Sequence, residues 1–384
     1  MHIQICLVSD QLLANYLPIL MKMPQCVHIV STAVMQQKGM TARFESMLHK
    51  QQIDTVTYHD MPDARMNDIH AYAQKLYTSI QNQTPHANIT LNITGGNKLM
   101  AVGMLDIFGA AGAKVIYTDT ANNRIEYLSH RVYDEPLPYL LDIPQYLHAY
   151  GAIFQSINSD DPAWQKRTLE RRHMTLHMAR LCQQERQCSL ITVLNGMAGS
   201  VLPNGSKVLK TNPTTCFDAP VRSPWSDTLN LLQATGLIRF HDQQWIEFLD
   251  EERTQYIKGN WLEEFAYHIA MALEGDDGWD VGCNVQIQWL NSDVRNELDL
   301  VIVYHNRLLV MECKTLRFDT VQKASDSVYK LDSIGERLRG AFGTKVLLSA
   351  LPVPKPALER ATSQGITVIR PWEWQTFLEA WKAR

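Results

Sequence analysis

The stretch "NELDLVIVYHNRLLVMECKT", residues 296–315, has the pattern of a buried β-hairpin. Two apolar runs flank a polar dipeptide at 305–306, which predicts two antiparallel strands joined by a two-residue turn. Asp299 interrupts the first run, and Glu312 and Lys314 end the second. Charged side chains are rarely buried unless they are paired or have a function. These three residues are therefore candidates for a functional site.

The register of the hairpin decides which charges meet. A turn centred between residues 305 and 306 places Asp299 opposite Glu312, and Glu297 opposite Lys314, on one face of the sheet. Facing Cβ atoms lie about 5 Å apart, a distance at which two carboxylates repel each other. A divalent cation bound by the carboxylate oxygens would remove that repulsion, and a nearby lysine would stabilise charge during phosphoryl transfer. The same residues are also compatible with a solvated charge cluster that is satisfied by Lys314 and water.

A helix is predicted upstream, in "GNWLEEFAYHIAMAL" at residues 259–273, because apolar residues recur there at helical spacing. At about 100° per residue, Glu263 lies on the flank of the apolar face and Glu264 points nearly opposite. We therefore expect Glu263, rather than Glu264, to reach the carboxylates of the hairpin. Changing Glu263 is expected to affect activity more than changing Glu264.

The order of a helix with Glu263, a strand with Asp299 and a strand with Glu-Cys-Lys at 312–314 resembles that of the PD-(D/E)xK nucleases. The resemblance implies metal-dependent hydrolysis of phosphodiester bonds in DNA and/or RNA. In this family Asp299 and Glu312 would hold Mg²⁺ or Mn²⁺, with Glu263 helping directly or through water. Lys314 would orient or activate the attacking water. Four later cations are candidates for contacts with the nucleic-acid backbone, or for an ordinary solvated face: Lys330, Arg337, Arg339 and Lys345.

The N-terminal third predicts a parallel sheet covered by helices on both faces, because short apolar segments alternate with helical or turn segments. The predicted strands are IQICLVS (3–9), QCVHIVST (25–32), IDTVTYH (53–59), NITLNIT (88–94), AKVIYTDT (113–120) and RIEYLS (124–129). Ligands of such sheets bind beyond the carboxyl ends of the strands. At one such end, Gly95 and Gly96 allow a tight turn and Lys98 opens a helix, which is the chemistry of a phosphate-binding loop. A plain strand-to-helix turn would also explain these residues.

This loop resembles the Thr-Gly-Gly-[Thr/Asn]-Lys-x-Met signature of CARF domains, the CRISPR-associated Rossmann folds. The resemblance implies a homodimer whose two CARF domains form one pocket for a cyclic oligoadenylate, most often the tetra-adenylate. A two-fold symmetric interface suits such a ligand. The ligand-binding residues that it implies are Ser9, Asp10, Gln11 and Asn15 after the first strand, and Thr94, Gly95, Gly96, Asn97 and Lys98 after the fourth. Thr118 and Asp119, after a later strand, are further candidates.

Length and composition bound the rest of the chain. The 384 residues predict an α/β protein with a Rossmann-like CARF domain (1–148), a winged-helix-like connector (149–250) and a nuclease domain (251–384). With a net charge of −4, nucleic acid must be bound by local patches, of which residues 165–181 are the most basic candidate. That stretch is equally compatible with a solvated helix. Seven cysteines without a C-x-x-C pair, no signal peptide and no run of eighteen apolar residues predict a cytoplasmic protein without a membrane span.

The complete order resembles the CARF-nuclease fusions of type III CRISPR defence, which cut single-stranded DNA and RNA or nick duplex DNA when a cyclic oligoadenylate activates them. One alternative is a non-catalytic CARF sensor, or transcriptional regulator, that acts through the winged-helix-like module. Another is that the CARF domain itself degrades the messenger. The intact set of Asp299, Glu312 and Lys314 favours the nuclease over the sensor.

Overall fold

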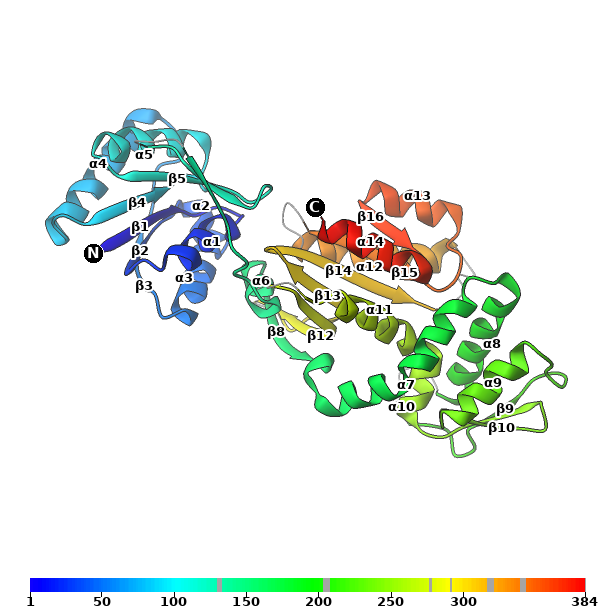
Figure 1. Cartoon of the computed structure of the whole chain (residues 1–384). Coiled ribbons are helices and arrows are strands. Elements are labelled where there is room, and N and C mark those ends of the chain that lie inside the picture. The colour runs from blue at the N-terminus through cyan, green and yellow to red at the C-terminus, as the bar shows by residue number, and fades with distance from the viewer. Residues whose placement is uncertain are drawn as a thin grey trace. The chain divides into compact units, whose positions relative to one another are not determined.

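The structure is a computed structural model that describes residues 1–129, 133–202, 208–275, 278–290, 292–315, 321–338 and 343–383. The chain forms two compact units. The first comprises Met1–Ile153 together with the short turn Tyr304–Arg307, and the second contains most of the remaining residues (Figure 1). Within the described ranges, no helix combines the length and the apolar character that crossing a membrane requires.

The N-terminal unit is built on a seven-stranded sheet in the order β3-β2-β1-β4-β5-β6-β7. The strands are β1 (His2–Leu7), β2 (Cys26–Val30), β3 (Asp54–Tyr58), β4 (Asn88–Asn92), β5 (Lys114–Asp119), β6 (Arg124–Tyr127) and β7 (Tyr133–Pro136). The first five are parallel, and β6 and β7 extend the sheet antiparallel. Order and direction confirm the predicted Rossmann-like arrangement.

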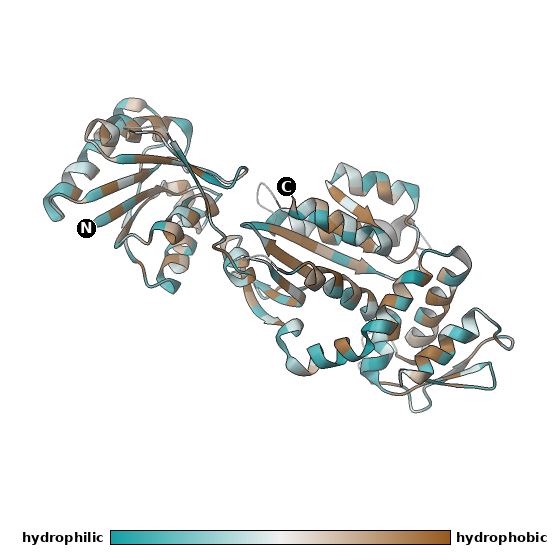
Figure 2. Cartoon of the chain, viewed as in Figure 1, coloured by the Kyte–Doolittle hydropathy of each residue, from teal (hydrophilic) through white to brown (hydrophobic). Residues whose placement is uncertain are grey.

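The helices of this unit are α1 (Leu13–Lys22), α2 (Ala33–Gln37), α3 (Met40–Lys50), α4 (Met66–Gln83), α5 (Lys98–Ala110) and α6 (Ile143–Ala149). Alternate residues of β1, Ile3, Ile5 and Leu7, share one hydrophobic core with Ile69 of α4 and Met104 of α5. The helices α1 and α3 lie on the other face of the sheet (Figure 1). Because the sheet is covered on both faces, its inner strands β1 and β2 are buried along almost their whole length, and hydrophobic residues dominate its centre (Figure 2).

The second unit contains a six-stranded sheet in the order β16-β15-β14-β13-β12-β8. Its strands are β8 (Ala152–Ile157), β12 (Asp280–Trp289), β13 (Arg295–Tyr304), β14 (Arg307–Lys314), β15 (Thr344–Ser349) and β16 (Ile366–Ile369). The helices associated with this sheet are α11 (Trp261–Ala272), α12 (Val321–Leu338), α13 (Lys355–Ser363) and α14 (Trp374–Lys382). The edge strand β8 comes from the part of the chain that we expected to be a connector, and the sequence did not predict its pairing.

The predicted hairpin is confirmed. The strands β13 and β14 are joined by His305 and Asn306, which have φ angles of +52° and +60°. Two left-handed residues are what a type I′ turn requires, and asparagine tolerates this conformation better than most residues. The turn therefore sets the register that brings the charged positions of the two strands together.

Between β8 and β12 in the sequence, the chain forms α7 (Pro162–Leu181), α8 (Glu185–Val201), β9 (Thr214–Cys216), α9 (Trp225–Ala234), β10 (Ile238–His241), β11 (Trp245–Phe248) and α10 (Glu251–Gln255). The three strands form a small sheet in the order β10-β11-β9. Three helices, α7, α8 and α9, precede the antiparallel hairpin of β10 and β11. The winged-helix assignment and the division into three domains stay predictions, since α7 to β11 cluster with the second unit rather than alone.

Candidate active site and ligand cleft

Two buried carboxylates meet on the hairpin of the second unit. Asp299 of β13 is 6% exposed and Glu312 of β14 is 3% exposed. The Oδ2 atom of Asp299 accepts a hydrogen bond of 2.7 Å from the backbone N–H of Cys313, the residue after Glu312. Burial, reinforced by the charge of Glu312, raises the pKa of Asp299 to about 7. The sequence-predicted pair is therefore together, in a site where two negative charges oppose each other.

Glu263 of α11 joins this pair from a different element. Burial and the charge of Asp299 raise the pKa of Glu263 well above its usual range. Its Oε2 atom accepts a hydrogen bond of 2.7 Å from Nδ2 of Asn284, on β12. Asn284 is almost buried and has a φ of +54°, an uncommon conformation within a strand. Asn284 is a site residue that sequence reasoning missed, because one asparagine inside an apolar strand carries no motif.

Two lysines contact Glu312. Lys314 Nζ lies 2.6 Å from Oε1 of Glu312, and Lys330 Nζ of α12 lies 3.0 Å from both oxygens. The predicted facing of Glu297 and Lys314 does not become an ion pair: Lys314 binds Glu312, while Glu297 accepts hydrogen bonds from Gln286 and Asn284. Lys330, which we expected either to contact the nucleic-acid backbone or to lie on a solvated helix face, therefore belongs to the site.

The residues of the site fit the chemistry of a divalent cation. Asp299, Glu312 and Glu263 offer hard oxygen donors, and burial together with neighbouring carboxylates raises the pKa of Asp299 and of Glu263. Among the described residues, no group of three or more histidine, cysteine, aspartate or glutamate side chains is arranged as a complete set of metal ligands. Mg²⁺ typically keeps several waters and takes few carboxylates, so an incomplete protein shell is compatible with it.

The raised pKa of Asp299 makes a prediction about stability. A carboxyl group with a higher pKa in the folded than in the unfolded state favours folding at low pH, and this contribution is lost as the pH rises from about 4 through about 7. We expect Asp299→Asn to raise the stability of the metal-free protein at pH 8, visible as a higher melting temperature. The exposed Asp293→Asn serves as the control and is expected to change nothing. A lower melting temperature for Asp299→Asn at pH 8 would contradict this account.

A cleft of about 460 Å³ opens at the carboxyl ends of β1, β4 and β5 in the N-terminal unit. Five of the nine predicted ligand residues line it: Ser9, Asp10, Gln11, Thr94 and Gly96. The further candidates Thr118 and Asp119 line it too. The sequence analysis missed Tyr117, Tyr146, Tyr150, Asn306 and Arg307, all of which contribute to the wall. Aromatic rings and an arginine suit a ligand with bases and phosphates.

The other four predicted ligand residues do not line the cleft. Asn15 is fully buried, and its Nδ2 donates a hydrogen bond of 2.7 Å to the carbonyl of Leu7. A Cβ at Gly95 would lie 1.8 Å from the same carbonyl oxygen, so only glycine fits there. Asn97 caps α5 by accepting a hydrogen bond of 2.9 Å from the N–H of Met100. Asn15, Gly95 and Asn97 thus build the loop.

Lys98 is the first residue of α5 and its side chain is exposed. Thr94, by contrast, ties two strands together at the base of the cleft. Its hydroxyl donates to Oδ1 of Asn92 at 2.6 Å and accepts from the N–H of Thr118 at 2.6 Å. The role of Lys98 as a ligand contact stays a prediction.

Comparison with known families identifies the domains at both ends of the chain. A family model described as the Card1 CARF domain matches residues 3–146, and one described as the Card1-like endonuclease domain matches residues 250–384. The chain is a CARF-nuclease fusion. The two motifs that the sequence analysis singled out, one after β4 and one on the β13–β14 hairpin, lie inside the two matched segments.

Solved structures give the same result for the fold of this CARF-nuclease fusion. Can2 from Sulfobacillus thermosulfidooxidans, solved in complex with cyclic tetra-adenylate, is 26% identical with a TM-score of 0.80, covering 100% of this chain and 97% of that chain. Protein VC1899 from Vibrio cholerae is 19% identical, with the same TM-score and a coverage of 100% and 98%. A type III CRISPR defence DNA nuclease activated by cyclic oligoadenylate is 14% identical, with a TM-score of 0.54 and a coverage of 90% and 45%. No match was found among curated proteins.

Three of the cations that we considered as contacts for nucleic acid have other outcomes. Lys345 is 1% exposed and lies 2.6 Å from Asp332 and 2.9 Å from Glu336, so its proposed contact with nucleic acid is wrong. The guanidinium of Arg337 lies over the ring of Trp289, 3.6 Å from its centroid. Arg339 falls outside the described residues. Arg337 lies on α12 and Lys345 pairs with two residues of it, so tertiary packing rather than local pattern decides the partners of these two cations.

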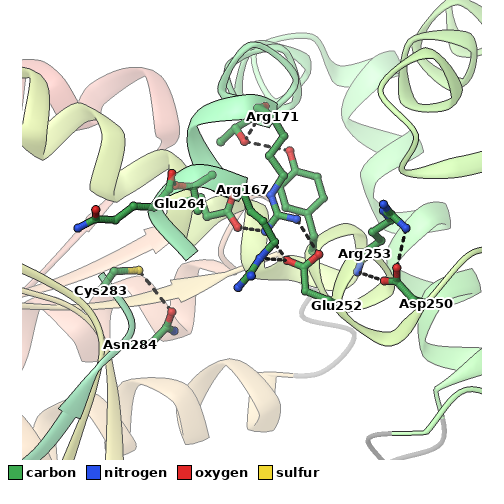
Figure 3. A network of polar contacts seen from close by, with 12 residues as sticks. Arg167, Arg171, Asp250, Glu252, Arg253, Glu264, Cys283 and Asn284 are labelled. Atoms are coloured by element: carbon green, nitrogen blue, oxygen red, sulfur yellow. Dashed lines mark hydrogen bonds and ion pairs between the residues drawn. The ribbon is translucent and has the colours of Figure 1, made fainter. Parts of the chain in front are cut away.

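Glu264 has a structural partner (Figure 3). The helical pattern directed it away from the apolar face, but it is only 2% exposed because α7 packs against α11. Arg171 of α7 binds both of its oxygens, with Nε 2.9 Å from Oε2. Arg171 also donates a hydrogen bond of 3.0 Å to Glu252 and lies over the ring of Tyr256. Arg171, in the basic stretch 165–181, therefore pairs with side chains of the protein itself.

Proposed function

We propose that this CARF-nuclease fusion is a metal-dependent endonuclease that a cyclic oligoadenylate activates, and that it acts in the cytoplasm. The observation that carries the proposal is the buried pair of Asp299 and Glu312 beside Lys314, in the domain that matches an endonuclease family. Burying two neighbouring carboxylates lowers the stability of the fold, and apolar side chains at the same positions would stabilise it more. The arrangement suits a site that is completed by a cation and a phosphodiester.

In the proposed reaction, Asp299 and Glu312 would hold Mg²⁺ or Mn²⁺, and Glu263 would act directly or through water. Such an ion supplies Lewis-acid activation of a water and of the phosphoryl oxygen. Lys314 is positioned by Glu312, and its ammonium would orient the attacking water and stabilise the negative charge that grows on the phosphate. The burial of both carboxylates strengthens each of these electrostatic interactions.

For the messenger, we propose a cyclic oligoadenylate, with the tetra-adenylate as the first candidate. The support comes from the CARF match, from the cleft of the N-terminal unit, and from Can2, which is similar over the whole chain and was solved with cyclic tetra-adenylate. Tyr146 and Tyr150 stack on each other with ring centroids 5.1 Å apart, and both line the cleft. Their rings offer surfaces on which adenine bases could stack.

We further propose that two copies of the chain assemble around one messenger, since a two-fold symmetric ring matches an isologous dimer interface. For the messenger to activate, it must bind the active arrangement more tightly than the inactive one. The turn Tyr304–Arg307 belongs to the N-terminal unit, and Asn306 and Arg307 line its cleft. The strands that leave this turn carry Asp299 and Glu312, so the backbone itself connects the cleft residues with the carboxylates.

The proposal is tested by incubating the purified protein with Mn²⁺ and labelled single-stranded DNA, single-stranded RNA or supercoiled plasmid, with and without cyclic tetra-adenylate. We expect cleavage of at least one substrate only when the messenger is present, and none with Asp299→Asn, which removes a metal-binding charge. Messenger binding by the variant should be unchanged, because Asp299 is no part of the cleft. Binding of the messenger without cleavage of any substrate would instead support the sensor function.

A further inference from the structure

Lys330 occupies the part of the active site that a cation needs. Its Nζ atom lies 3.0 Å from each oxygen of Glu312, a bidentate contact that holds the whole carboxylate. The side chain of Glu312 is only 4% exposed, and Lys314 lies 2.6 Å from its Oε1 atom. Two ammonium groups therefore compensate one buried carboxylate, while the neighbouring Asp299 has neither as a hydrogen-bond partner among the described contacts. The distribution of positive charge in the site is uneven.

The two lysines differ in how freely they can leave Glu312. Lys314 is two residues away on the same strand, so the sheet fixes its backbone, and its side chain is 27% exposed. Lys330 comes from α12, and its side chain is 43% exposed. A lysine has a flexible four-carbon stem and a strongly hydrated ammonium, so Lys330 can turn into the solvent at little cost.

A divalent cation that binds Glu312 requires at least one of its oxygens. The ammonium group of Lys330, at 3.0 Å from both oxygens of Glu312, would repel that cation, and water screens the repulsion little because Glu312 is buried. Lys330 must therefore move when the cation binds. After the movement its charge remains on α12 beside the site, where the anionic phosphodiester has to enter.

We propose that Lys330 is a displaceable cation of the active site. It neutralises Glu312 until a divalent metal ion binds, and it then contacts a non-bridging oxygen of the substrate phosphate. This inference rests on the proposed function, and it assigns to Lys330 a part in metal binding and substrate contact that the Glu-Cys-Lys pattern does not indicate. Before the metal ion binds, the ammonium group of Lys330 balances negative charge in the site.

The first test measures Mn²⁺ binding alone, without nucleic acid or messenger, by calorimetry or by the loss of the free Mn²⁺ resonance. We expect Lys330→Met to bind Mn²⁺ about tenfold more tightly than the wild type, because the competing charge is gone. Lys330→Arg should stay near or below the affinity of the wild type. Lys355→Met removes a lysine that is paired with Glu359 on α13, outside the site, and should have no effect.

The second test measures single-turnover cleavage at saturating Mn²⁺. Lys330→Met is expected to cleave about tenfold more slowly despite its tighter metal binding, because the contact with the phosphate is lost. A single variant that improves metal affinity and impairs cleavage is not explained by a structural role alone. Unfolding followed by tryptophan fluorescence verifies that the variant is folded.

The outcomes separate this inference from the proposed function. If wild-type protein binds Mn²⁺, Asp299→Asn does not, and Lys330→Met binds Mn²⁺ with wild-type or weaker affinity, the displacement is refuted and the metal site stands. Tighter Mn²⁺ binding with undiminished cleavage refutes the phosphate contact. If the wild type shows no Mn²⁺ binding that depends on Asp299, the metal-dependent function fails, and the inference about Lys330 fails with it.

Discussion

Replacing Glu312 with glutamine is expected to lower the rate of messenger-dependent cleavage by about 10³-fold or more. The substitution keeps the shape of the side chain but removes the charge that would bind the metal ion and that positions Lys314 at 2.6 Å. It also removes the partner of Lys330, so two ammonium groups lose their common anion. Glutamine can accept a hydrogen bond from one lysine, so the fold is retained.

The measurement is single-turnover cleavage with saturating Mn²⁺ and cyclic tetra-adenylate, beside a binding assay for the messenger. Affinity for the messenger should be that of the wild type, because Glu312 lies outside the cleft. Glu359→Gln, an exposed change on α13, provides the control and should leave cleavage intact. A Glu312→Gln variant that keeps a tenth or more of the wild-type rate would exclude Glu312 from the reaction.

Arg171→Ala is expected to lower the free energy of unfolding of the second unit by about 3–5 kcal/mol. The change leaves Glu264 buried and without its bidentate partner (Figure 3). Burial already raises the pKa of Glu264, an effect that the charge of Arg171 opposes, so the variant has to bury an unpaired carboxylate or protonate it. The loss of packing against the ring of Tyr256 adds to the effect.

Tryptophan fluorescence is a suitable probe in urea titrations, since all nine tryptophans lie at or after residue 164 and therefore report the second unit. Arg167→Ala is the matched control, because that arginine is half-exposed and lies 3.8 Å from Glu252. It should change stability by less than about 1 kcal/mol. The double variant Arg171→Met/Glu264→Leu should regain much of the loss, since apolar replacement removes both buried charges. Equal stability of Arg171→Ala and Arg167→Ala would show that the pair contributes little.

Local sequence determined the parts of the molecule that depend on neighbours in the chain. The dipeptide at 305–306 sets the two-residue turn, and the turn brings Asp299 and Glu312 together within fifteen residues of chain. In the loop after β4, Gly95 permits a path past the Leu7 carbonyl that other residues cannot follow, and Gly96 adopts a φ of +70°. The spacing of apolar strands and helices predicted the parallel sheet of the N-terminal unit, because connection rules leave few arrangements for such a series.

Only the tertiary structure decided which distant elements supply the remaining groups. Lys330 of α12 reaches Glu312 of β14, and Asn284 of β12 reaches Glu263 of α11. The tyrosines of the cleft lie outside the sequence motifs. Helical periodicity placed Glu264 on a different side of its helix from Glu263, but it could not show that α7 supplies a partner for Glu264. The physical reason is that turns and registers follow from short-range backbone geometry, whereas burial and charge pairing depend on packing between segments far apart in the sequence.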